Sequence, residues 1–437
     1  MLGYYLRLAW LSMRRTPAIT LLMVGAIAVG IGATTTTLTV HHLMSSNPLA
    51  HRNAVLRAVT IDSWDPNHPA FDDHPTFAPH ELVYRDALAI AESGVADRAV
   101  IMRKTSFTLE PAPGAKPFLV EGRLATRDFF PMFDVPFAYG SGWDRHADES
   151  GEHVVVLSRQ TNEKAFGGTN SIGKTIRLDG RDYRIIGVLA DYAPTPKVYD
   201  LNNGSFDDIE DVFVPFALGK TYAMSPSGNV NCWKPEILNG VADLYGSECT
   251  WHQLWIEADS PAKLERVQSY IDGYVQSQKK LGRLPRKMNN TLYSPSDWLD
   301  RYEVVGHDSK LLLWVSFAFL AVCILNVVGL LLSRFLGSAG SSALRRALGA
   351  SRGELFRQHL VEVALVGAIA GLGGLVLGWA GLKAMQNLYS GFQRLTHLDV
   401  PMTFAALGLA VLAGVLAGLY PAWRVCRVQP ASYLKTQ

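Results

Sequence analysis

Residues 18–43 have the sequence AITLLMVGAIAVGIGATTTTLTVHHL, which contains no Asp, Glu, Lys or Arg. A helix needs about 20 apolar residues to cross the hydrocarbon core of a bilayer, so this stretch is long enough to span a membrane. Three later stretches, residues 311–333, 363–382 and 400–423, are equally free of these charged residues. We therefore predict an α-helical membrane protein with four transmembrane helices.

The composition agrees with this prediction. Charged residues make up 18% of the 437 residues, whereas about 25% is typical of soluble globular proteins. The net charge is only +2, so no nucleic-acid partner is expected. A cleaved signal peptide is the alternative for the first stretch, because Arg14 and Arg15 precede it. The stretch is longer than the usual ~7–15 apolar residues and has no clear cleavage site, so we expect a retained helix.

The arginines that flank the stretches predict the orientation, because basic residues near membrane helices stay in the cytoplasm. They precede the first stretch, separate the second from the third and follow the fourth, whereas the loop between the third and fourth offers only Lys383 and Arg394. Both termini are therefore expected in the cytoplasm of a bacterium, with the chain in the inner membrane. Residues 45–309 then form a large periplasmic domain inserted between helices 1 and 2.

These boundaries divide the chain as follows: 1–17 interfacial amphipathic helix, 18–44 first span, 45–309 periplasmic α/β domain, 310–335 second span, 336–358 cytoplasmic coupling segment, 359–386 third span, 387–400 short external loop, 401–423 fourth span and 424–437 cytoplasmic tail. Within the periplasmic domain, alternating apolar residues predict a hairpin over 175–188 and a strand over 251–258. A helix is expected from Pro261 to about Lys280. Residues 284–309 are expected to be a polar connection back to the membrane.

Two further patterns concern packing. Glycines spaced by four residues allow membrane helices to approach closely, which predicts a helix bundle, although glycine is also simply common in such helices. The candidates are Gly367, Gly371, Gly374, Gly378, Gly414 and Gly418. Cys232 and Cys249 both fall in the periplasmic domain, where a disulfide between them is expected; two buried free thiols are the alternative.

Residues 168–175, GTNSIGKT, match the phosphate-loop pattern G-x-x-x-x-G-K-[ST]. That loop needs a helix directly after it to bind phosphates, whereas an alternating strand and an Asp-Gly turn follow here. We judge Gly168, Gly173, Lys174 and Thr175 to be a false match. The sequence contains no H-E-x-x-H or C-x-x-C pattern, so no metal site, no directly bound cofactor and no catalytic residue are expected.

Three motifs resemble those of MacB-like permeases of ABC transporters, the type VII or mechanotransmission family, whose membrane domain is shared with FtsX. They are FGGTNSIGKTIRLDG (166–180) with YRIIGV (183–188), RRALGASRGELFRQ (345–358) with Glu362, and YPAWR (420–424) with Arg427 and Pro430. In that family the segment between spans two and three carries a coupling helix that contacts the ATPase. The resemblance therefore assigns this contact to Arg345, Arg346, Leu348, Gly349, Ala350 and Arg352; anchoring to lipid headgroups is the alternative.

The resemblance implies a non-catalytic permease subunit. ATP and Mg would be bound by a separate cytoplasmic ATPase dimer, and the permease would pair with a second copy or a paralogous permease. Residues 335–343, FLGSAGSSA, lack the charged stretch that the family usually carries there, which suggests a weaker or asymmetric contact. Movement of the periplasmic domain would then drive efflux, with a periplasmic adaptor and an outer-membrane channel as further partners besides membrane lipid. Lipoprotein extraction, control of an external enzyme and a receptor or scaffold without an energy source are the alternatives.

Overall fold

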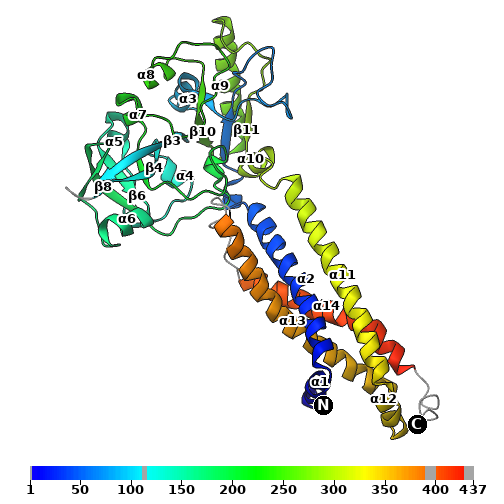
Figure 1. The fold of residues 1–437 in the computed structure, drawn as a ribbon. Helices are drawn as coiled ribbons and strands as arrows, with labels where there is room; N and C mark the ends of the chain where they lie inside the picture. The colour runs from blue at the N-terminus through cyan, green and yellow to red at the C-terminus, as the bar shows by residue number, and fades with distance from the viewer. Residues whose placement is uncertain (1, 111–115, 389–399, 428–437) are drawn as a thin grey trace. The chain divides into compact units, whose positions relative to one another are not determined.

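The computed structural model describes residues 2–110, 116–388 and 400–427. The chain divides into two compact units: a helical unit, Met1–Ser45 with Val305–Gln437, and an α/β unit, Ser46–Val304 (Figure 1). The α/β unit is thus an insertion between two helices of the helical unit, as the sequence predicts. The chain passes between the units twice, after Ser45 and after Val304.

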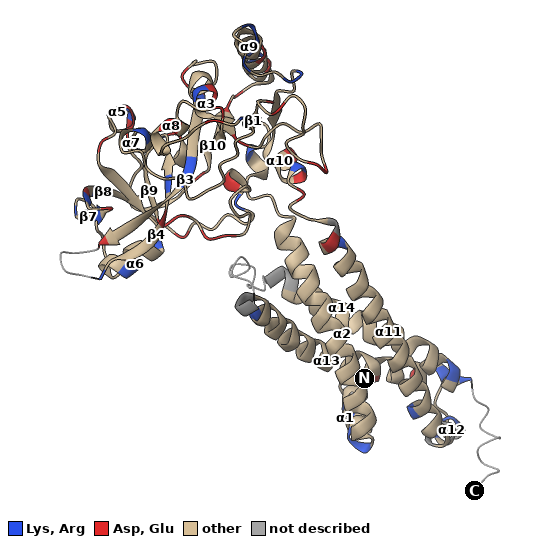
Figure 2. Ribbon diagram, turned by 45° about the horizontal axis from the view of Figure 1, so that its top comes forward, with Lys and Arg blue, Asp and Glu red and all other residues tan. Residues whose placement is uncertain are grey.

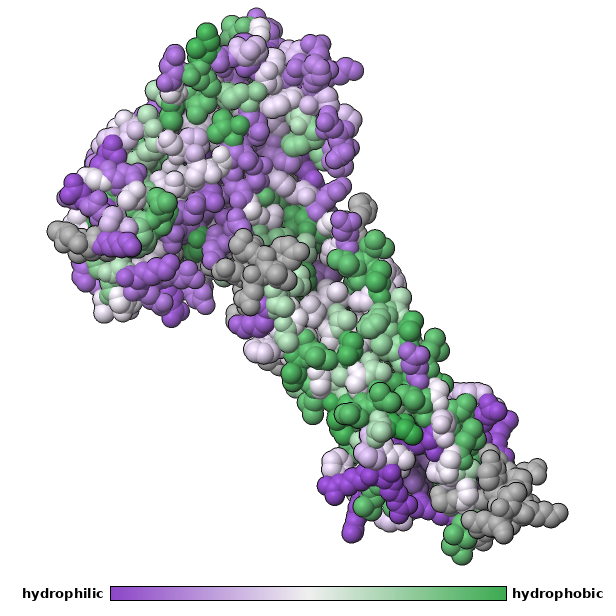
Figure 3. Space-filling view, in the orientation of Figure 1, coloured by the Kyte–Doolittle hydropathy of each residue, from purple (hydrophilic) through white to green (hydrophobic). Residues whose placement is uncertain are grey.

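The helical unit is built from α1 (Leu2–Arg15), α2 (Pro17–Met44), α11 (His307–Gly337), α12 (Ala339–Ala347), α13 (Arg352–Leu388) and α14 (Val400–Cys426). Among the described residues, α2, α11, α13 and α14 are the four helices long and apolar enough to cross a membrane. Figure 3 shows an apolar band along this unit, with polar surface at the end that carries α1 and α12. The prediction of four helices with the length and apolarity of membrane spans is therefore confirmed.

Small residues bring the membrane helices into contact. Gly367 of α13 lies against Gly414 of α14, where a Cβ atom added to Gly414 would come within 3.0 Å of the Gly367 Cα. Gly374 of α13 faces α2, where an added Cβ would lie 2.6 Å from Cγ2 of Ile31. The structure also places Gly371, Gly378 and Gly418 at contacts between helices. Without a hydrophobic drive between helices in lipid, such close backbone approach supplies the packing.

Threonines of α2 add hydrogen bonds to this packing. Thr34 Oγ1 donates to the backbone oxygen of Ser316 in α11 at 3.2 Å, and Thr36 Oγ1 donates to that of Gly378 in α13 at 3.3 Å. Thr37 Oγ1 pairs with Ser316 Oγ at 2.8 Å. These bonds hold α2 between the two other helices.

The α/β unit contains eleven strands within its described residues: β1 (Leu56–Thr60), β2 (Leu82–Val83), β3 (Arg98–Glu110), β4 (Phe118–Ala125), β5 (Phe137–Gly140), β6 (Val154–Leu157), β7 (Thr175–Leu178), β8 (Arg181–Leu189), β9 (Val212–Pro215), β10 (Thr250–Glu257) and β11 (Thr291–Tyr293). They form one sheet in the order β11-β1-β10-β3-β4-β9-β6-β8-β5, with β2 paired to β10 and β7 paired to β3 and β8. Only the β4–β9 and β6–β8 pairs are parallel among the described strands. The sheet is therefore mostly antiparallel.

Helices accompany the sheet: α3 (Tyr84–Ala91), α4 (Phe129–Met132), α5 (Arg145–Ser150), α6 (Arg159–Phe166), α7 (Ala217–Thr221), α8 (Val241–Leu244), α9 (Pro261–Lys280), α10 (Pro295–Arg301) and two 3-10 turns, η1 (Ala50–Arg52) and η2 (Val198–Asp200). Side chains alternate across a strand, and a buried apolar cluster lies on each face of the sheet. On β10, Leu254 and Ile256 join the core that α3 and α9 complete. Trp255 points to the opposite core, which α4 and α10 cover.

Several predicted elements match the structure closely, and one prediction needs correction. The predicted 175–188 hairpin is β7–β8, the strand at 251–258 is β10 and the helix from Pro261 is α9. Residues 284–309, expected to be a plain connection, instead form β11 and α10, and α11 already begins at His307. A capping box between Ser294 and Asp297 starts α10, a local signal that overrides the segment's polar composition.

The helix of the third span is longer than the span predicted at 359–386. α13 begins at Arg352, inside the predicted coupling segment, and runs without a break to Leu388. Hydrophobicity marks only the part of a helix that lies in lipid, whereas capping residues determine where the helix starts. The predicted external loop and cytoplasmic tail fall largely on residues 389–399 and 428–437, which lie outside the described part of the chain.

Candidate functional site

The segment between α11 and α13, predicted to couple to an ATPase, contains the short helix α12. α12 ends where Gly349 adopts φ +102°, a backbone conformation that favours glycine. The backbone N–H of Gly349 donates to the oxygen of Arg346 at 3.1 Å and that of Ala350 to the oxygen of Arg345 at 3.0 Å. These bonds satisfy carbonyl groups at the end of the helix.

Ser351 and Glu354 start the next helix with a capping box. The Glu354 N–H donates to Ser351 Oγ at 3.2 Å, and the Ser351 N–H donates to Glu354 Oε2 at 2.8 Å. The pattern S-x-x-E was visible in the sequence but was not used to place the helix start. The turn between α12 and α13 is therefore defined on both sides.

The predicted contact residues divide into an outward and an inward group. Leu348 is 80% exposed, and Gly349 and Arg352 are exposed beside it. Leu344, which was not predicted, is 55% exposed one helical turn before Leu348. Together, Leu344, Leu348, Gly349 and Arg352 form what we call the α12 tip. Figure 2 shows the basic residues of α12 at this end of the helical unit.

The second, inward group is defined by a contact with α13 or by partial burial. Arg345 is exposed but donates from Nη1 to Oε1 of Gln358 on α13 at 2.9 Å, while Arg346 and Ala350 are half-buried. The six residues assigned by resemblance therefore do not form one surface. Leu348, Gly349 and Arg352 are exposed, whereas Arg346 and Ala350 are half-buried and Arg345 bonds to α13.

A buried ion pair lies behind this segment. Arg334, near the end of α11, approaches Oε1 of Glu362 on α13 with its Nη2 at 2.6 Å, and the two side chains are 4% and 3% exposed. The same Nη2 donates to Ser12 Oγ of α1 at 3.1 Å, and His359 Nδ1 lies 3.6 Å from Glu362 Oε2. From the sequence, Arg334 belongs only to the arginines that separate the second stretch from the third. An arginine at the end of one span and a glutamate at the start of the next was the available signal for this pair.

The phosphate-loop match lies in a context opposite to the one that nucleotide binding requires. Gly168 and Gly173 lie in the loop after helix α6, and Thr175 begins strand β7. Gly173 donates its N–H to the oxygen of Ile185 at 2.8 Å, and Lys174 donates its N–H to that of Ser171 at 3.1 Å. One of these amides bonds to β8 and the other within the loop, and a strand rather than a helix follows them.

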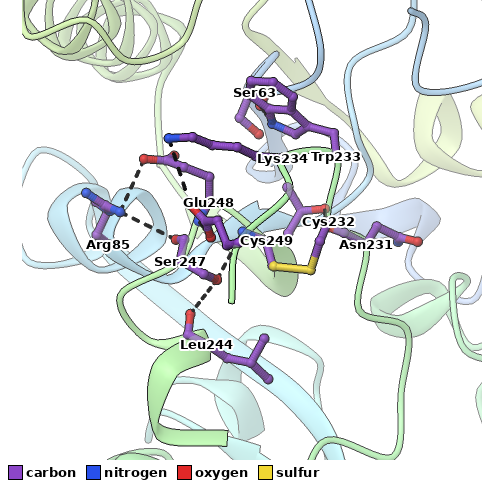
Figure 4. The surroundings of a disulfide bond; sticks show 12 residues. Ser63, Arg85, Asn231, Cys232, Trp233, Lys234, Leu244, Ser247, Glu248 and Cys249 are labelled. Carbon is purple, nitrogen blue, oxygen red and sulfur yellow. Dashed lines mark hydrogen bonds and ion pairs between the residues drawn. A yellow bond between two sulfur atoms is a disulfide. The ribbon is translucent and has the colours of Figure 1, made fainter. Parts of the chain in front are cut away.

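The structure joins Cys232 and Cys249 in a disulfide next to the start of β10 (Figure 4). Asn231 and Thr250 exchange backbone hydrogen bonds beside it, at 3.0 and 2.8 Å, and Trp233 Nε1 donates to the oxygen of Ser63 at 2.8 Å. The bond therefore fastens the long segment before α8 to the sheet.

Three histidines of the α/β unit contact neighbouring side chains. Among the described residues, no group of three or more His, Cys, Asp or Glu side chains is placed to hold a metal ion. His68 pairs with Asp65 and His74 with Glu303. His80 instead contacts the ring of Tyr302, with the ring centroids 4.0 Å apart. Burial, aided by the nearby Arg301 charge, lowers the pKa of His80 to about 3, so its ring is neutral.

A fully buried charge cluster was also missed by the sequence analysis. Arg123 of β4 pairs with Asp200 and Glu210, and Lys197 Nζ approaches Glu210 at 3.1 Å. Burial alone would raise the pKa of Glu210, but Arg123 and Lys197 outweigh it and hold that pKa well below its usual range. Gln253 of β10 donates to Asp200 at 2.6 Å. The cluster connects residues 197–210 to the centre of the sheet. No local sequence pattern predicts such a contact between residues far apart in the chain.

Comparison with known proteins assigns both parts of the chain. Residues 20–274 match the MacB-like periplasmic core domain, and residues 313–430 match the FtsX-like permease C-terminal domain. A macrolide export ATP-binding/permease protein, MacB of Syntrophobacter fumaroxidans, is 22% identical over 343 residues, which cover 71% of this chain and 46% of that protein. A pyoverdine export ATP-binding/permease protein, PvdT of Pseudomonas aeruginosa, is 20% identical over 314 residues, with 71% and 41% covered.

The chain thus spans less than half the length of these two relatives. Among solved structures, the periplasmic region of MacB from Actinobacillus actinomycetemcomitans aligns with 59% of this chain and 97% of its own length, at 12% identity and a TM-score of 0.37. The first family match alone covers more than half of the chain, and the second follows it in sequence order. The chain belongs to the family of MacB-like, FtsX-like permeases.

Proposed function

We propose that the chain is the permease subunit of an ABC transporter and that it converts ATP hydrolysis by a cytoplasmic ATPase into movement of its periplasmic domain. The observation that carries this proposal is the α12 tip. Two exposed leucines lie in α12 and just after its last residue, and the exposed Arg352 begins α13. Gly349 closes α12, and a capping box opens α13. An exposed apolar patch with a basic residue suits a protein–protein contact.

Connectivity supports transmission of the movement. The α/β unit is joined to the helical unit through α2 and α11, and α11 continues into α12 with one residue between them. Displacement of α12 by an ATPase would therefore act directly on one of the two helices that carry the α/β unit. The substrate would not need to pass through the bilayer.

The proposed orientation places both termini and α12 in the cytoplasm and the α/β unit in the periplasm, because arginines flank the helices on the α1 and α12 side. In this arrangement a pair of ATPase subunits binds ATP and Mg, and a second permease, identical or paralogous, completes the complex. The names of the two relatives describe export of a macrolide and of pyoverdine. By analogy we propose efflux of a periplasmic substrate, assisted by an adaptor and an outer-membrane channel.

The experiment is affinity purification of the full chain in mild detergent, with identification of bound subunits and assay of ATP hydrolysis. Leu348→Asp should reduce recovery of the ATPase at least about tenfold, because a charge would be buried at the contact. Leu281→Asp is the matched control, since Leu281 is 73% exposed on the α/β unit and Leu348 is 80% exposed. It should leave recovery unchanged.

The purified partners also separate the alternatives. A periplasmic adaptor supports efflux, whereas a lipoprotein or an external hydrolase would replace efflux by extraction or enzyme control driven by the same movement. Recovery of no ATPase with the wild-type chain, or equal recovery with both variants, would contradict the proposed contact. The remaining alternative would then be a receptor or scaffold without an energy source.

A further inference from the structure

A cavity of about 400 Å³ lies at the α1 and α12 end of the helical unit. It is enclosed by α1, the first turn of α2, the end of α11, α12 and the start of α13. All these elements belong to the same compact unit. The cavity is separate from the α12 tip, since neither Leu344 nor Leu348 lines it.

The charge of the cavity favours an anion. Three arginines line it, Arg15, Arg334 and Arg345, against a single carboxylate, Glu362. Glu362 Oε1 forms an ion pair with Nη2 of Arg334 at 2.6 Å, although among the described residues this oxygen and both ring nitrogens of His359 have no hydrogen-bond partner of good geometry. Within the described part of the chain, the buried Nη1 of Arg334 has no hydrogen-bond partner. A buried guanidinium nitrogen without an acceptor is costly, so an anionic oxygen at this position would satisfy it.

The remaining lining is that of an amphiphilic ligand. Leu8, Leu11, Ile19 and Phe335 supply apolar surface to the same cavity, and Ser12 and Ser338 supply hydroxyl groups. α1 also exposes Tyr4, Trp10 and Leu11 while burying Ala9 and Met13. Such a helix, with arginines beside exposed aromatic and aliphatic side chains, lies at the level of the lipid headgroups.

We propose that this cavity binds the phosphate of an anionic phospholipid, with Arg15 and Arg345 at its rim and Arg334 at its base. Basic pockets between membrane helices on the cytoplasmic side are suited to acidic headgroups. The phosphate ester would accept hydrogen bonds from the guanidinium groups, which are well matched to phosphate geometry. Because Arg345 belongs to α12 and Arg15 to α1, the bound lipid would connect the coupling segment to the N-terminal helix.

The test is lipid binding to the full chain in neutral detergent, followed by native mass spectrometry. Phosphatidylglycerol is compared with phosphatidylcholine of the same acyl chains, and inorganic phosphate is added in a separate arm. Selective binding of phosphatidylglycerol is expected. The double variant Arg15→Gln/Arg345→Gln should bind it about 30-fold more weakly, from the loss of two arginine–lipid interactions. Both side chains are exposed, so their replacement leaves the buried Arg334–Glu362 pair in place.

The matched control is Arg14→Gln/Arg357→Gln, which removes the same charge from two exposed arginines of α1 and α13 that do not line the cavity. It should keep near wild-type affinity. Equal loss in both double variants would mean general surface attraction and would overturn the site. Equal binding of the two lipids would also overturn it. A third result would also overturn the lipid site: the double variant Arg15→Gln/Arg345→Gln weakens binding of inorganic phosphate but does not weaken binding of the lipid. Lipid binding is measured without an ATPase, so the test does not depend on whether an ATPase docks on the α12 tip.

Discussion

At the scale of single residues, the α/β unit depends on buried charges that are satisfied only as a group. Arg123, Asp200 and Glu210 are fully buried, and each charge is compensated by the others and by Lys197. A buried ion pair adds little net stability compared with apolar packing, but removal of one partner leaves an uncompensated charge. Replacement of Arg123 should therefore lower the stability of the α/β unit more than replacement of an exposed ion-pair partner.

Arg123→Met should lower the free energy of unfolding by about 3–5 kcal/mol, because two carboxylates remain buried with a single lysine. Chemical denaturation of the chain, followed by tryptophan fluorescence, measures this loss. Arg159→Met is the control: Arg159 pairs with Glu163 at 3.0 Å on an exposed helix face, and its loss should cost at most about 0.5 kcal/mol. Similar losses in both variants would contradict the structural role of the cluster.

Asp148 should make stability depend on pH in the direction opposite to that of most carboxylates. Burial raises its pKa to about 6, despite hydrogen bonds from the Arg127 N–H and Trp143 Nε1. The folded state therefore retains a proton that the unfolded state has lost, and the group's contribution to stability falls as the pH rises from about 4 to 6. Asp148→Asn should remove a pH-dependent contribution of about 2 kcal/mol across this window. Unfolding free energies of both proteins at pH 4, 5, 6 and 7 test this, and a constant difference between them would refute it.

At the scale of elements, local sequence patterns predicted helices and turns, whereas contacts between distant residues could not be predicted. The hairpin at 175–188 could be predicted because its Asp179-Gly180 turn and its alternation of apolar and polar residues involve only neighbouring residues. In the structure both turn residues have positive φ, as such a turn requires. The pairing of β4 with β9, or of Arg123 with Glu210, joins residues far apart in the chain and leaves no local pattern. The membrane helices were predictable because lipid imposes length and apolarity on each helix separately.

The coupling segment shows the same division. Its position followed from resemblance, but which side chains point outward depends on helix phase and on the turn at Gly349. This explains why Leu344 was missed and why Arg345 proved to face Gln358. The Arg334–Glu362 pair likewise required knowledge of which helices are neighbours.

Gly349→Ala should weaken coupling to the ATPase. The residue has φ +102°, and an added Cβ would meet nothing within 4 Å, so the cost is backbone strain of about 1–3 kcal/mol at the end of α12. Gly353→Ala is the control, because it lies in the first turn of α13 with open space around it and should be neutral or slightly stabilising. ATP hydrolysis by the purified complex is the measurement, and wild-type rates in both variants would show that the turn is dispensable.

At the scale of the whole molecule, one chain combines a helical unit that suits lipid with an α/β unit inserted after its first long helix. The insertion makes α2 and α11 the covalent carriers of the α/β unit, and α12 follows α11 directly. The proposed export function requires the α/β unit and α12 to lie on opposite sides of the membrane. If both were on the same side, no movement could be transmitted across the bilayer.

Labelling of single cysteines in spheroplasts with a membrane-impermeant maleimide tests this requirement directly. In a background in which Cys323 and Cys426 are replaced by serine, one variant carries Lys280→Cys, at an exposed position of α9, and the other carries Arg352→Cys in the α12 tip. Lys280→Cys is expected to react in intact spheroplasts, whereas Arg352→Cys should react only after permeabilisation. Labelling of Arg352→Cys in intact spheroplasts, or protection of Lys280→Cys, would show that the proposed topology is wrong.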